Sequence, residues 1–441
     1  MRPELMVQGF RTGIEPLPKW YSGNKAADPW AAAGFAGICD EPRRVQLMSR
    51  IASIPDVHEC LARHVDAVID IALTTERIVG AVVLIALEGR VVYERAAGFA
   101  DREARLPIRK DTIFRFASVT KVIVSATALA MIERRIVLLD DPVNRWLPRF
   151  RPKLGDGSEH AITVRQLMTH TAGLDYGFAP AGGSYQQAQV SSGLDMPGLS
   201  MADAIARLGS APLINEPGRV WNYSLATDVL GAVLESAGGA SLPELVRELV
   251  TGPMRMTSTD FHVPPDRVER LAVPYADGMP RPVRMNEPHE MTCQFGLVRF
   301  CPSRVLDSHS YASGGAGMAG TAGDLLALLE AVRRGGSPIL SLDSAAALTT
   351  DALPPNMTTS FPGWGYGLGV GVLRDRLLAG VPHENGTWRG GGAYGNDWFV
   401  NPHRKLTVVS LTNTALEGSD GAYPQNLRDA IYHALTSNPS K

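Results

Sequence analysis

The sequence lacks the cysteine patterns that mark disulfide-rich and zinc-binding proteins. Its 441 residues hold four cysteines, with no C-x-x-C pair and no zinc-ligand spacing among them: Cys39, Cys60, Cys293 and Cys301. A chain of this length also buries a core large enough to fold without disulfide bonds. We therefore expect free thiols in a reducing compartment, and hence a cytoplasmic protein.

The chain also lacks an excess of charge of either sign and any long apolar run. Its formal net charge is -2, which gives no attraction to nucleic acid or to an anionic membrane surface. The first residues include Glu4 and no signal-peptide core, and no later stretch reaches the ~18 consecutive apolar residues of a membrane span. We expect a small-molecule partner, no nucleic acid and no membrane; the sequence does not indicate an oligomeric state.

Two hydrolase motifs are absent as well. There is no Gly-x-Ser-x-Gly, which disfavours an esterase of the α/β-hydrolase type. There is no His-Glu-x-x-His, which would indicate a zinc hydrolase. The sequence therefore implies no metal and no other cofactor.

What the chain does have is the composition and periodicity of a globular α+β protein, with 45% hydrophobic and 20% charged residues. A helix, a hairpin and then a long apolar helix predict an antiparallel sheet covered by helices. The segments 175–200 and 262–312 are predicted to be a surface loop and a long irregular excursion. The predicted helices cover 57–76, 118–133, 162–174, 201–208, 224–237, 321–334 and 425–435, and the predicted strands cover 81–87, 91–96, 365–372, 398–401 and 406–412.

The stretch Ser118-Val119-Thr120-Lys121 stands at the head of the long apolar run. Because residues three apart share a face in the first turn of a helix, Ser118 and Lys121 can touch. A serine hydroxyl is a weak nucleophile until a base takes its proton, and a desolvated lysine can take it or tune a neighbouring base. An isolated Ser-x-x-Lys is more often a helix start with a solvated lysine, so the pattern needs support from elsewhere in the chain.

His170, in the predicted helix 162–174, is open to a catalytic and to a structural interpretation. No carboxylate stands at a spacing from His170 that would indicate a catalytic pair. We favour a buried ring that is hydrogen-bonded to the backbone.

Three separated pieces of the chain resemble one family: Ser118-Val119-Thr120-Lys121, Tyr223-Ser224-Leu225 and Trp388-Arg389-Gly390-Gly391-Gly392-Ala393-Tyr394-Gly395. Their order and spacing resemble the serine β-lactamase and penicillin-binding superfamily, and most closely its family VIII carboxylesterases, which are similar to class C β-lactamases. Supporting stretches are 167–174, 313–318 and 411–415.

The resemblance implies a β-lactamase-like α+β fold, in which helices flank an antiparallel sheet and the active site lies between the sheet and a mostly helical domain. On this basis 1–55 is an N-terminal extension. Residues 56–135 and 305–441 form the α/β sandwich domain, and 136–304 form a mainly helical domain with long irregular loops.

The resemblance also implies roles for individual residues. Ser118 is the nucleophile, Lys121 is its hydrogen-bonded activator, and Tyr223 relays a proton to the leaving group. A phenol with a pKa of about 10 can act as a base at neutral pH only if a cation such as Lys121 stabilises the phenolate. Whether Lys121 or Tyr223 takes the first proton is open in the sequence.

In the family the third piece lies on the edge strand of the active site, and a backbone N–H there forms the oxyanion hole with that of the nucleophile. Esterases of the family usually show Trp-Gly-Gly at this place and β-lactamases Lys-Thr-Gly. If Tyr394-Gly395 sets the register, Gly390 takes the place of that Trp or Lys, and Ala393 supplies the N–H. If Trp388-Arg389-Gly390 is the motif, Gly391 supplies it.

We prefer the first register. It leaves the wall of the pocket without a bulky side chain unless Arg389 or Trp388 folds back to replace it. The candidate oxyanion-hole and substrate-binding residues are therefore Ser118, Gly390, Gly391, Gly392, Ala393 and Trp388.

Two departures from the family pattern bear on the substrate. Leu225 stands where β-lactamases carry Asn, and the third piece has no lysine to meet a substrate carboxylate. Both favour a small neutral acyl ester over a penicillin, with weak β-lactam hydrolysis as a side activity. The predicted function is a serine carboxylesterase that forms an acyl-Ser118 intermediate.

Two alternatives remain. A transacylase would hand the acyl group to an amine or a hydroxyl of a second small molecule. A non-catalytic penicillin-binding-like sensor would need none of the chemistry, and the joint presence of Ser118, Lys121 and Tyr223 speaks against it.

Overall fold

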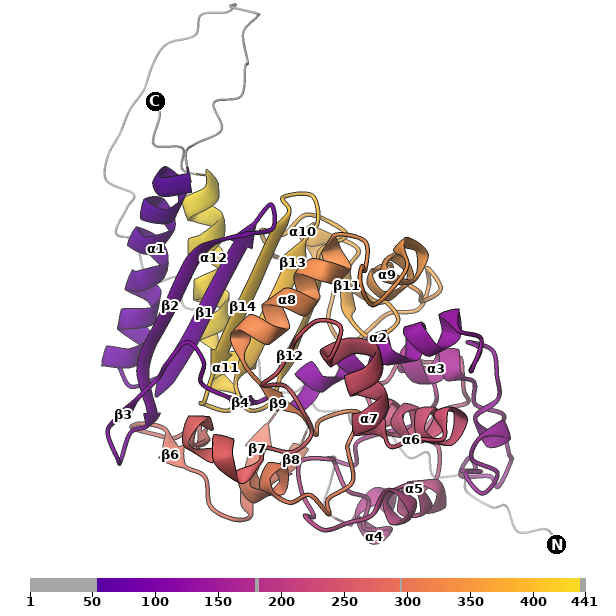
Figure 1. Ribbon diagram of the computed structural model, residues 1–441. Coiled ribbons are helices and arrows are strands. Elements are labelled where there is room, and N and C mark those ends of the chain that lie inside the picture. Colours follow the sequence, from indigo (N-terminus) through magenta and orange to yellow (C-terminus); the bar gives the residue numbers. More distant parts are fainter. Residues whose placement is uncertain (1–53, 179–181, 294–295, 437–441) are drawn as a thin grey trace, which may run out of the picture. The chain divides into compact units, whose positions relative to one another are not determined.

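The computed structural model describes residues 54–178, 182–293 and 296–436 (Figure 1). These residues belong to one compact unit, so the sheet and the helices are parts of one folded body. The division into a sandwich domain and a helical domain stays a prediction about regions within this unit. The N-terminal extension predicted for 1–55 lies almost wholly outside the described residues.

An eight-stranded antiparallel sheet stands at the centre, in the order β10-β11-β12-β13-β14-β1-β2-β3 (Figure 1). The predicted hairpin forms β1 and β2, and β1 pairs on its other side with β14 from the C-terminal part of the chain. The strands of this sheet are β1 (Gly80–Leu87), β2 (Arg90–Asp101), β3 (Leu106–Pro107), β10 (Trp364–Tyr366), β11 (Gly371–Leu373), β12 (Trp388–Gly392), β13 (Asn396–Asn401) and β14 (Leu406–Thr412).

Two expectations about this sheet are wrong. The run 365–372 is not one strand, because Gly369 has a φ of 125° and the chain turns back there to form the hairpin β10–β11. The glycine-rich third piece forms β12, and β12 is not an edge strand, since β11 and β10 pair outside it.

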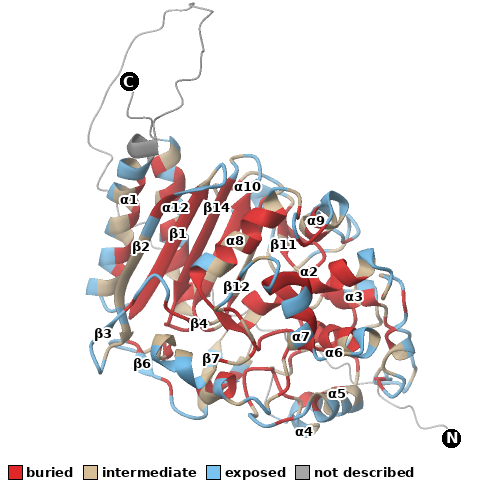
Figure 2. Cartoon of the chain, viewed as in Figure 1, coloured by how far each residue is buried: buried red, intermediate tan, exposed pale blue. Residues whose placement is uncertain are grey.

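Helices cover both faces of the sheet. On one face α1 (Ile54–Thr74) packs against α12 (Ala422–Thr436) over an apolar layer that includes Val83 and Phe399. On the other face α8 (Ala322–Arg333) contacts β1 and β14. The central strands β1, β13 and β14 are almost entirely buried, whereas β2 keeps exposed and half-buried residues (Figure 2).

The remaining helices pack beside the sheet around α2 (Thr120–Glu133), which is buried over most of its length. A helix that is apolar on all sides is stable only when other elements pack around it. The first turn of α2 is therefore buried inside the molecule. Its neighbours and the shorter helices are α3 (Val164–Met168), α4 (Ser184–Gln187), α5 (Met201–Ser210), α6 (Ala226–Gly238), α7 (Leu242–Val246), α9 (Leu342–Thr349), α10 (Arg376–Ala379), α11 (Glu417–Asp420) and the single turns η1 (Ala117–Val119), η2 (Val143–Arg145), η3 (Arg247–Thr251), η4 (Pro265–Arg270) and η5 (Pro302–Leu306).

Two loop regions differ from expectation. The helix predicted over 162–174 ends at Met168, because His170 adopts a positive φ of 54°. The segment predicted as a surface loop, 175–200, contributes buried side chains such as Tyr176, Tyr185 and Leu194. The segment is thus only partly a surface loop, with exposed residues such as Gln186, Gln187 and Gly198 beside these buried ones.

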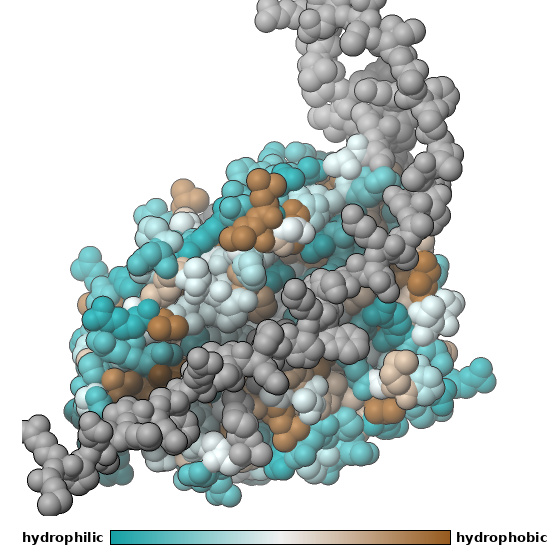
Figure 3. All heavy atoms as spheres, turned by 180° about the vertical axis from the view of Figure 1, so that it is seen from behind, coloured by the Kyte–Doolittle hydropathy of each residue, from teal (hydrophilic) through white to brown (hydrophobic). Residues whose placement is uncertain are grey.

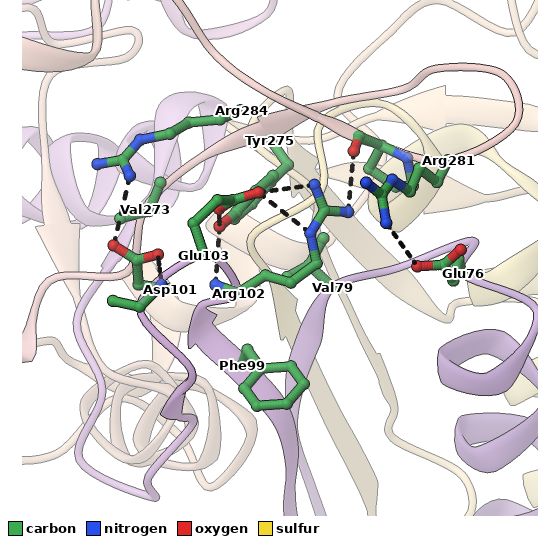
Figure 4. Close-up of polar contacts among 12 residues, drawn as sticks. Glu76, Val79, Phe99, Asp101, Arg102, Glu103, Val273, Tyr275, Arg281 and Arg284 are labelled. Atoms are coloured by element: carbon green, nitrogen blue, oxygen red, sulfur yellow. Dashed lines mark hydrogen bonds and ion pairs between the residues drawn. The ribbon is translucent and has the colours of Figure 1, made fainter.

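The excursion 262–312 contains short hairpins on an otherwise irregular path. A polar cluster fastens its first part to the end of β2 (Figure 4). There the Tyr275 hydroxyl donates to Glu103 and accepts from the Arg102 backbone N–H, and Arg102 donates to the carbonyl of Pro282 at 3.0 Å. The short strands outside the main sheet are β4 (Phe114–Arg115) with β9 (Ala319–Gly320), β5 (Tyr275–Ala276) with β6 (Val283–Arg284), and β7 (His289–Cys293) with β8 (Gly296–Phe300).

The surface seen in Figure 3 is mainly hydrophilic, with hydrophobic side chains in small separate groups. In the described part of the chain no single helix is long and apolar enough to cross a membrane. Ala226–Gly238 and Leu242–Thr251 reach that length only as a pair, which is bent by 83°. Cys60, Cys293 and Cys301 are free thiols, as predicted, and Cys39 lies outside the described residues.

Candidate active site

Ser118 sits in the turn that precedes α2. Ala117, just before it, has a φ of 44°, a conformation that costs energy in a residue with a side chain and that recurs at functional sites. The turn is held from outside, since the Phe116 N–H donates to the Met318 carbonyl and the Met318 N–H donates to Thr120 Oγ1. The surrounding structure therefore fixes the position of the serine.

Lys121 reaches back from the first turn of α2 to Ser118, as the spacing predicts. Its Nζ lies 3.1 Å from Ser118 Oγ, and it donates to the Tyr176 hydroxyl and the Gly315 carbonyl, both at 2.8 Å. The lysine is 3% exposed. The Gly315 carbonyl can only accept, so the lysine must donate there, whereas its contact with Ser118 can work in either direction.

The two tyrosines near Lys121 differ from expectation. Lys121 Nζ lies over the ring of Tyr223, 4.7 Å from its centroid, and the hydroxyl that it bonds belongs to Tyr176. Burial, and to a smaller extent the nearby Tyr223, raises the pKa of Tyr176. Tyr176 is therefore a neutral phenol at neutral pH. A cation on a ring face still stabilises negative charge on that ring. Tyr223 therefore still lies next to a cation, as its predicted role as a base requires. The cation faces its ring and is not hydrogen-bonded to its hydroxyl.

His170 is structural, in agreement with the sequence-based preference. Its ring is buried, and Nδ1 accepts the Ser224 backbone N–H at 3.3 Å. Burial and the charge of Lys121 hold its pKa well below the usual value, so the ring is neutral. It packs against Tyr223 with ring centroids 4.6 Å apart, and so supports that side chain from behind.

The glycine strand β12 runs past the serine turn. A Cβ on Gly392 would stand 2.0 Å from the Phe116 carbonyl oxygen, so only glycine allows this approach. The next residue, Ala393, accepts a hydrogen bond from the Leu416 N–H. Ala393 also lines the cavity together with Ser118. This arrangement favours the register in which Ala393 supplies the second oxyanion-hole donor.

We expect Gly392→Ala to lower kcat by about 100-fold, because the methyl group forces β12 away from Ser118 by an ångström or more. The enzyme should also lose about 1–3 kcal/mol of stability through overpacking. Steady-state kinetics and thermal melts measure both effects. Gly323→Ala, where a Cβ meets open space, is the matched control, and full activity in Gly392→Ala would contradict the assignment of this strand.

The open position at Gly390 is filled from the neighbouring strand. A Cβ on Gly390 would meet the indole of Trp398 at 2.6 Å, and the two residues are direct cross-strand partners in β12 and β13. Trp388, a candidate for substrate binding, is instead 2% exposed in the core and stacks edge-on against Trp398, with centroids 5.6 Å apart. Arg389, the other candidate, does line the cavity, where its guanidinium stacks over the Trp364 ring at 4.1 Å from the centroid.

A cavity of about 420 Å³ opens in front of Ser118 and Lys121. One wall is aromatic, and the predicted glycine strand forms another. Burial raises the pKa of Asp397, at the end beside Arg389, to about 7, against the opposing charge of Arg389. The aromatic residues and the residues of the glycine strand that line the cavity are Tyr176, Phe178, Trp221, Tyr223, Phe361, Trp364, Tyr366, Gly390, Gly391, Gly392, Ala393 and Trp398.

Sequence reasoning missed Tyr176 and Trp398. Tyr176 follows the quoted stretch 167–174 by two residues, so its position next to a recognised piece was the available signal. Nothing in the sequence points to Trp398, because its role depends on the pairing of β12 with β13. In the described part of the chain no three His, Cys, Asp or Glu side chains gather in the way that a metal site requires.

The sheet, the buried helix behind Ser118 and the cavity between them define a β-lactamase-like fold. Residues 61–431 match the β-lactamase family, and the chain belongs to that family. It is 46% identical to Esterase EstB of Burkholderia gladioli over 376 residues. The aligned region covers 84% of this chain and 95% of the relative.

Solved structures agree. The chain is similar to EstCE1, described as a hydrolase with promiscuous acyltransferase activity, with a TM-score of 0.83 and 43% identity over 86% of this chain and 100% of the other. The unliganded simvastatin synthase LovD of Aspergillus terreus shares the fold, with a TM-score of 0.66 and 22% identity over 85% of this chain and 98% of the other.

Proposed function

We propose that the protein is a serine carboxylesterase of the family VIII type that cleaves small neutral esters through an acyl-Ser118 intermediate. The observation that carries the proposal is the 3.1 Å contact of Lys121 Nζ with Ser118 Oγ at the wall of the cavity. The similarity to a protein named as an esterase supports the same reaction class. Weak hydrolysis of β-lactams fits as a side activity of the same acyl-enzyme chemistry.

In the proposed mechanism the neutral form of Lys121 takes the Ser118 proton while Oγ attacks the ester carbonyl. The N–H groups of Ser118 and Ala393 stabilise the oxyanion of the tetrahedral intermediate. The proton that Lys121 has taken passes through Tyr223 to the departing alcohol, and the same groups then activate the water that releases the acid. Tyr176 and the Gly315 carbonyl hold Lys121 in place throughout.

The test is turnover of p-nitrophenyl acetate and butyrate by the full chain. We expect rapid hydrolysis with a single p-nitrophenolate released per acid formed. Hydrolysis of neutral esters that is at least about 10-fold faster than that of a carboxylate-bearing ester of equal size would support the neutral-substrate assignment. Absence of any ester turnover would remove the proposal.

A second candidate function is acyl transfer to a small amine or alcohol. It is favoured by the similarity to EstCE1, whose description includes acyltransferase activity, and by a cavity with room for an acceptor beside a small acyl group.

We expect hydroxylamine to compete with water for the acyl-enzyme without being required for turnover. The measurement is the ratio of butyrohydroxamate to butyrate as the hydroxylamine concentration rises. A burst followed by slow turnover that the acceptor accelerates about 10-fold or more would show that transfer is the main reaction. A product mixture that hydroxylamine leaves unchanged would exclude transfer.

We also propose a cytoplasmic location. The support is that Cys60, Cys293 and Cys301 are unpaired thiols, a state that reducing compartments maintain.

A further inference from the structure

The stretch Ser313–Met318 supplies the Gly315 carbonyl that holds the catalytic lysine, and its own support comes from a part of the chain that the proposed mechanism does not use. Its glycines bring the backbone against the first turn of α6. A Cβ on Gly314 would stand 2.3 Å from the Thr227 carbonyl oxygen, and one on Gly315 would stand 2.4 Å from Asp228 Oδ2. The turn therefore lies in direct contact with Asp228, five residues after Tyr223.

Asp228 holds this turn. Ser313 donates its hydroxyl to Asp228 Oδ1 at 2.6 Å, and the Ala316 N–H donates to Ser313 Oγ at 3.0 Å. The carboxyl lies in the first turn of α6, where the helix dipole favours negative charge. One side chain thus fixes the conformation of the turn around Gly315.

The other side of the turn holds Lys121, since the Gly315 carbonyl accepts from Nζ at 2.8 Å. Asp228 is 3% exposed, and its Oδ2 accepts no hydrogen bond of good geometry in the described part of the chain, although the nearby Gly315 backbone N–H helps to lower the pKa of the carboxyl. A buried carboxylate oxygen in that state needs a nearby positive charge to offset the loss of water. The ammonium on the far side of Gly315 supplies one.

We infer that Asp228 is a positioning residue for Lys121, which fixes the lysine through the Ser313–Gly315 turn and sets its charge state through the carboxylate. The inference rests on the proposed function, because it matters only if Lys121 must lose a proton to activate Ser118. No family motif quoted above includes Asp228.

The consequence is a specific pH dependence. A carboxylate near an ammonium favours the protonated lysine, so removing it lets Lys121 lose its proton at lower pH. Burial raises the pKa of the Asp228 carboxyl, while the Ser313 bond and the charges of Lys121 and Arg304 oppose that change. The titratable and charged groups that face Lys121 or Asp228 are Tyr176, Tyr223, His170, Arg304 and Tyr311.

The experiment is the pH profile of kcat/KM for p-nitrophenyl butyrate in Asp228→Asn, which keeps the shape of the side chain and removes its charge. We expect the midpoint of the acid limb to move down by about one pH unit. We also expect kcat to fall by about 10-fold with KM unchanged, because the lysine is less well held. A folded, active variant with an unmoved midpoint would overturn the inference.

Two control variants separate charge from structure. Ser313→Ala removes the hydrogen bond and no charge, so it should lower kcat and leave the midpoint in place. Asp324→Asn removes a half-buried carboxylate, which bonds the Ser258 N–H and Thr259 and lies in the first turn of α8, so it should change stability without moving the midpoint.

If Asp228→Asn does not fold, Asp228→Ser takes its place in the experiment. We expect the same downward shift of the acid-limb midpoint of kcat/KM. An equal shift in Asp324→Asn would also overturn the inference. Wild-type turnover that does not depend on Ser118 would instead remove the proposed function, and this inference with it.

Discussion

Ser118→Ala lowers kcat/KM for p-nitrophenyl butyrate by at least about 10⁴-fold, because the other hydroxyl in the described part of the chain that contacts Lys121 belongs to Tyr176, a neutral phenol and a poor nucleophile. The variant keeps its fold, since the hydroxyl is partly exposed and its loss removes a single contact. Steady-state kinetics with a thermal melt measure both properties.

Ser125→Ala is the matched control on the same helix. Ser125 lies seven residues on, is buried against Gly369 and does not line the cavity. We expect activity within about 3-fold of wild type. Equal losses in the two variants would mean that the effect comes from helix α2 and not from a nucleophile.

Lys121→Met lowers kcat by about 10³-fold, which is the range for loss of a positioned general base. Methionine keeps the length of the side chain but offers no proton acceptor to Ser118 and no donor to Tyr176 or Gly315. Removing a buried charge offsets part of the cost of those lost bonds, so we expect Tm to change by only about 5 °C.

The pH profile makes this test specific. We expect the residual activity of Lys121→Met to lack the acid limb expected of wild type, because the proposed base is gone. An acid limb that persists with the same midpoint would assign the titration to another group, and would remove Lys121 from the role of base.

The contact at the centre of the site was predictable because it is local. Ser118 and Lys121 are three residues apart on a helix, and the apolar run behind them indicates burial, so spacing alone brings the side chains together. The hairpin β1–β2 and the helices α1, α8 and α12 follow from equally local periodicity.

What the sequence did not predict depends on contacts between distant parts of the chain. Tyr176 meets Lys121 across 55 residues, in a segment without periodicity that was expected at the surface. Trp398 fills the place of a side chain at 390 only because β13 pairs with β12 in one register. The early end of α3 depends on the positive φ of His170, which its contacts with Ser224 and Tyr223 hold in place.

The central claim is that the reaction passes through an acyl group on Ser118, and the most direct measurement traps that group. The full chain is mixed with p-nitrophenyl butyrate, quenched in acid within milliseconds, digested and analysed by mass spectrometry. The account predicts a butyryl group on the peptide that carries Ser118, and none on that peptide in Ser118→Ala. A butyryl group on another residue, or turnover with no acyl-enzyme at any quench time, would contradict it.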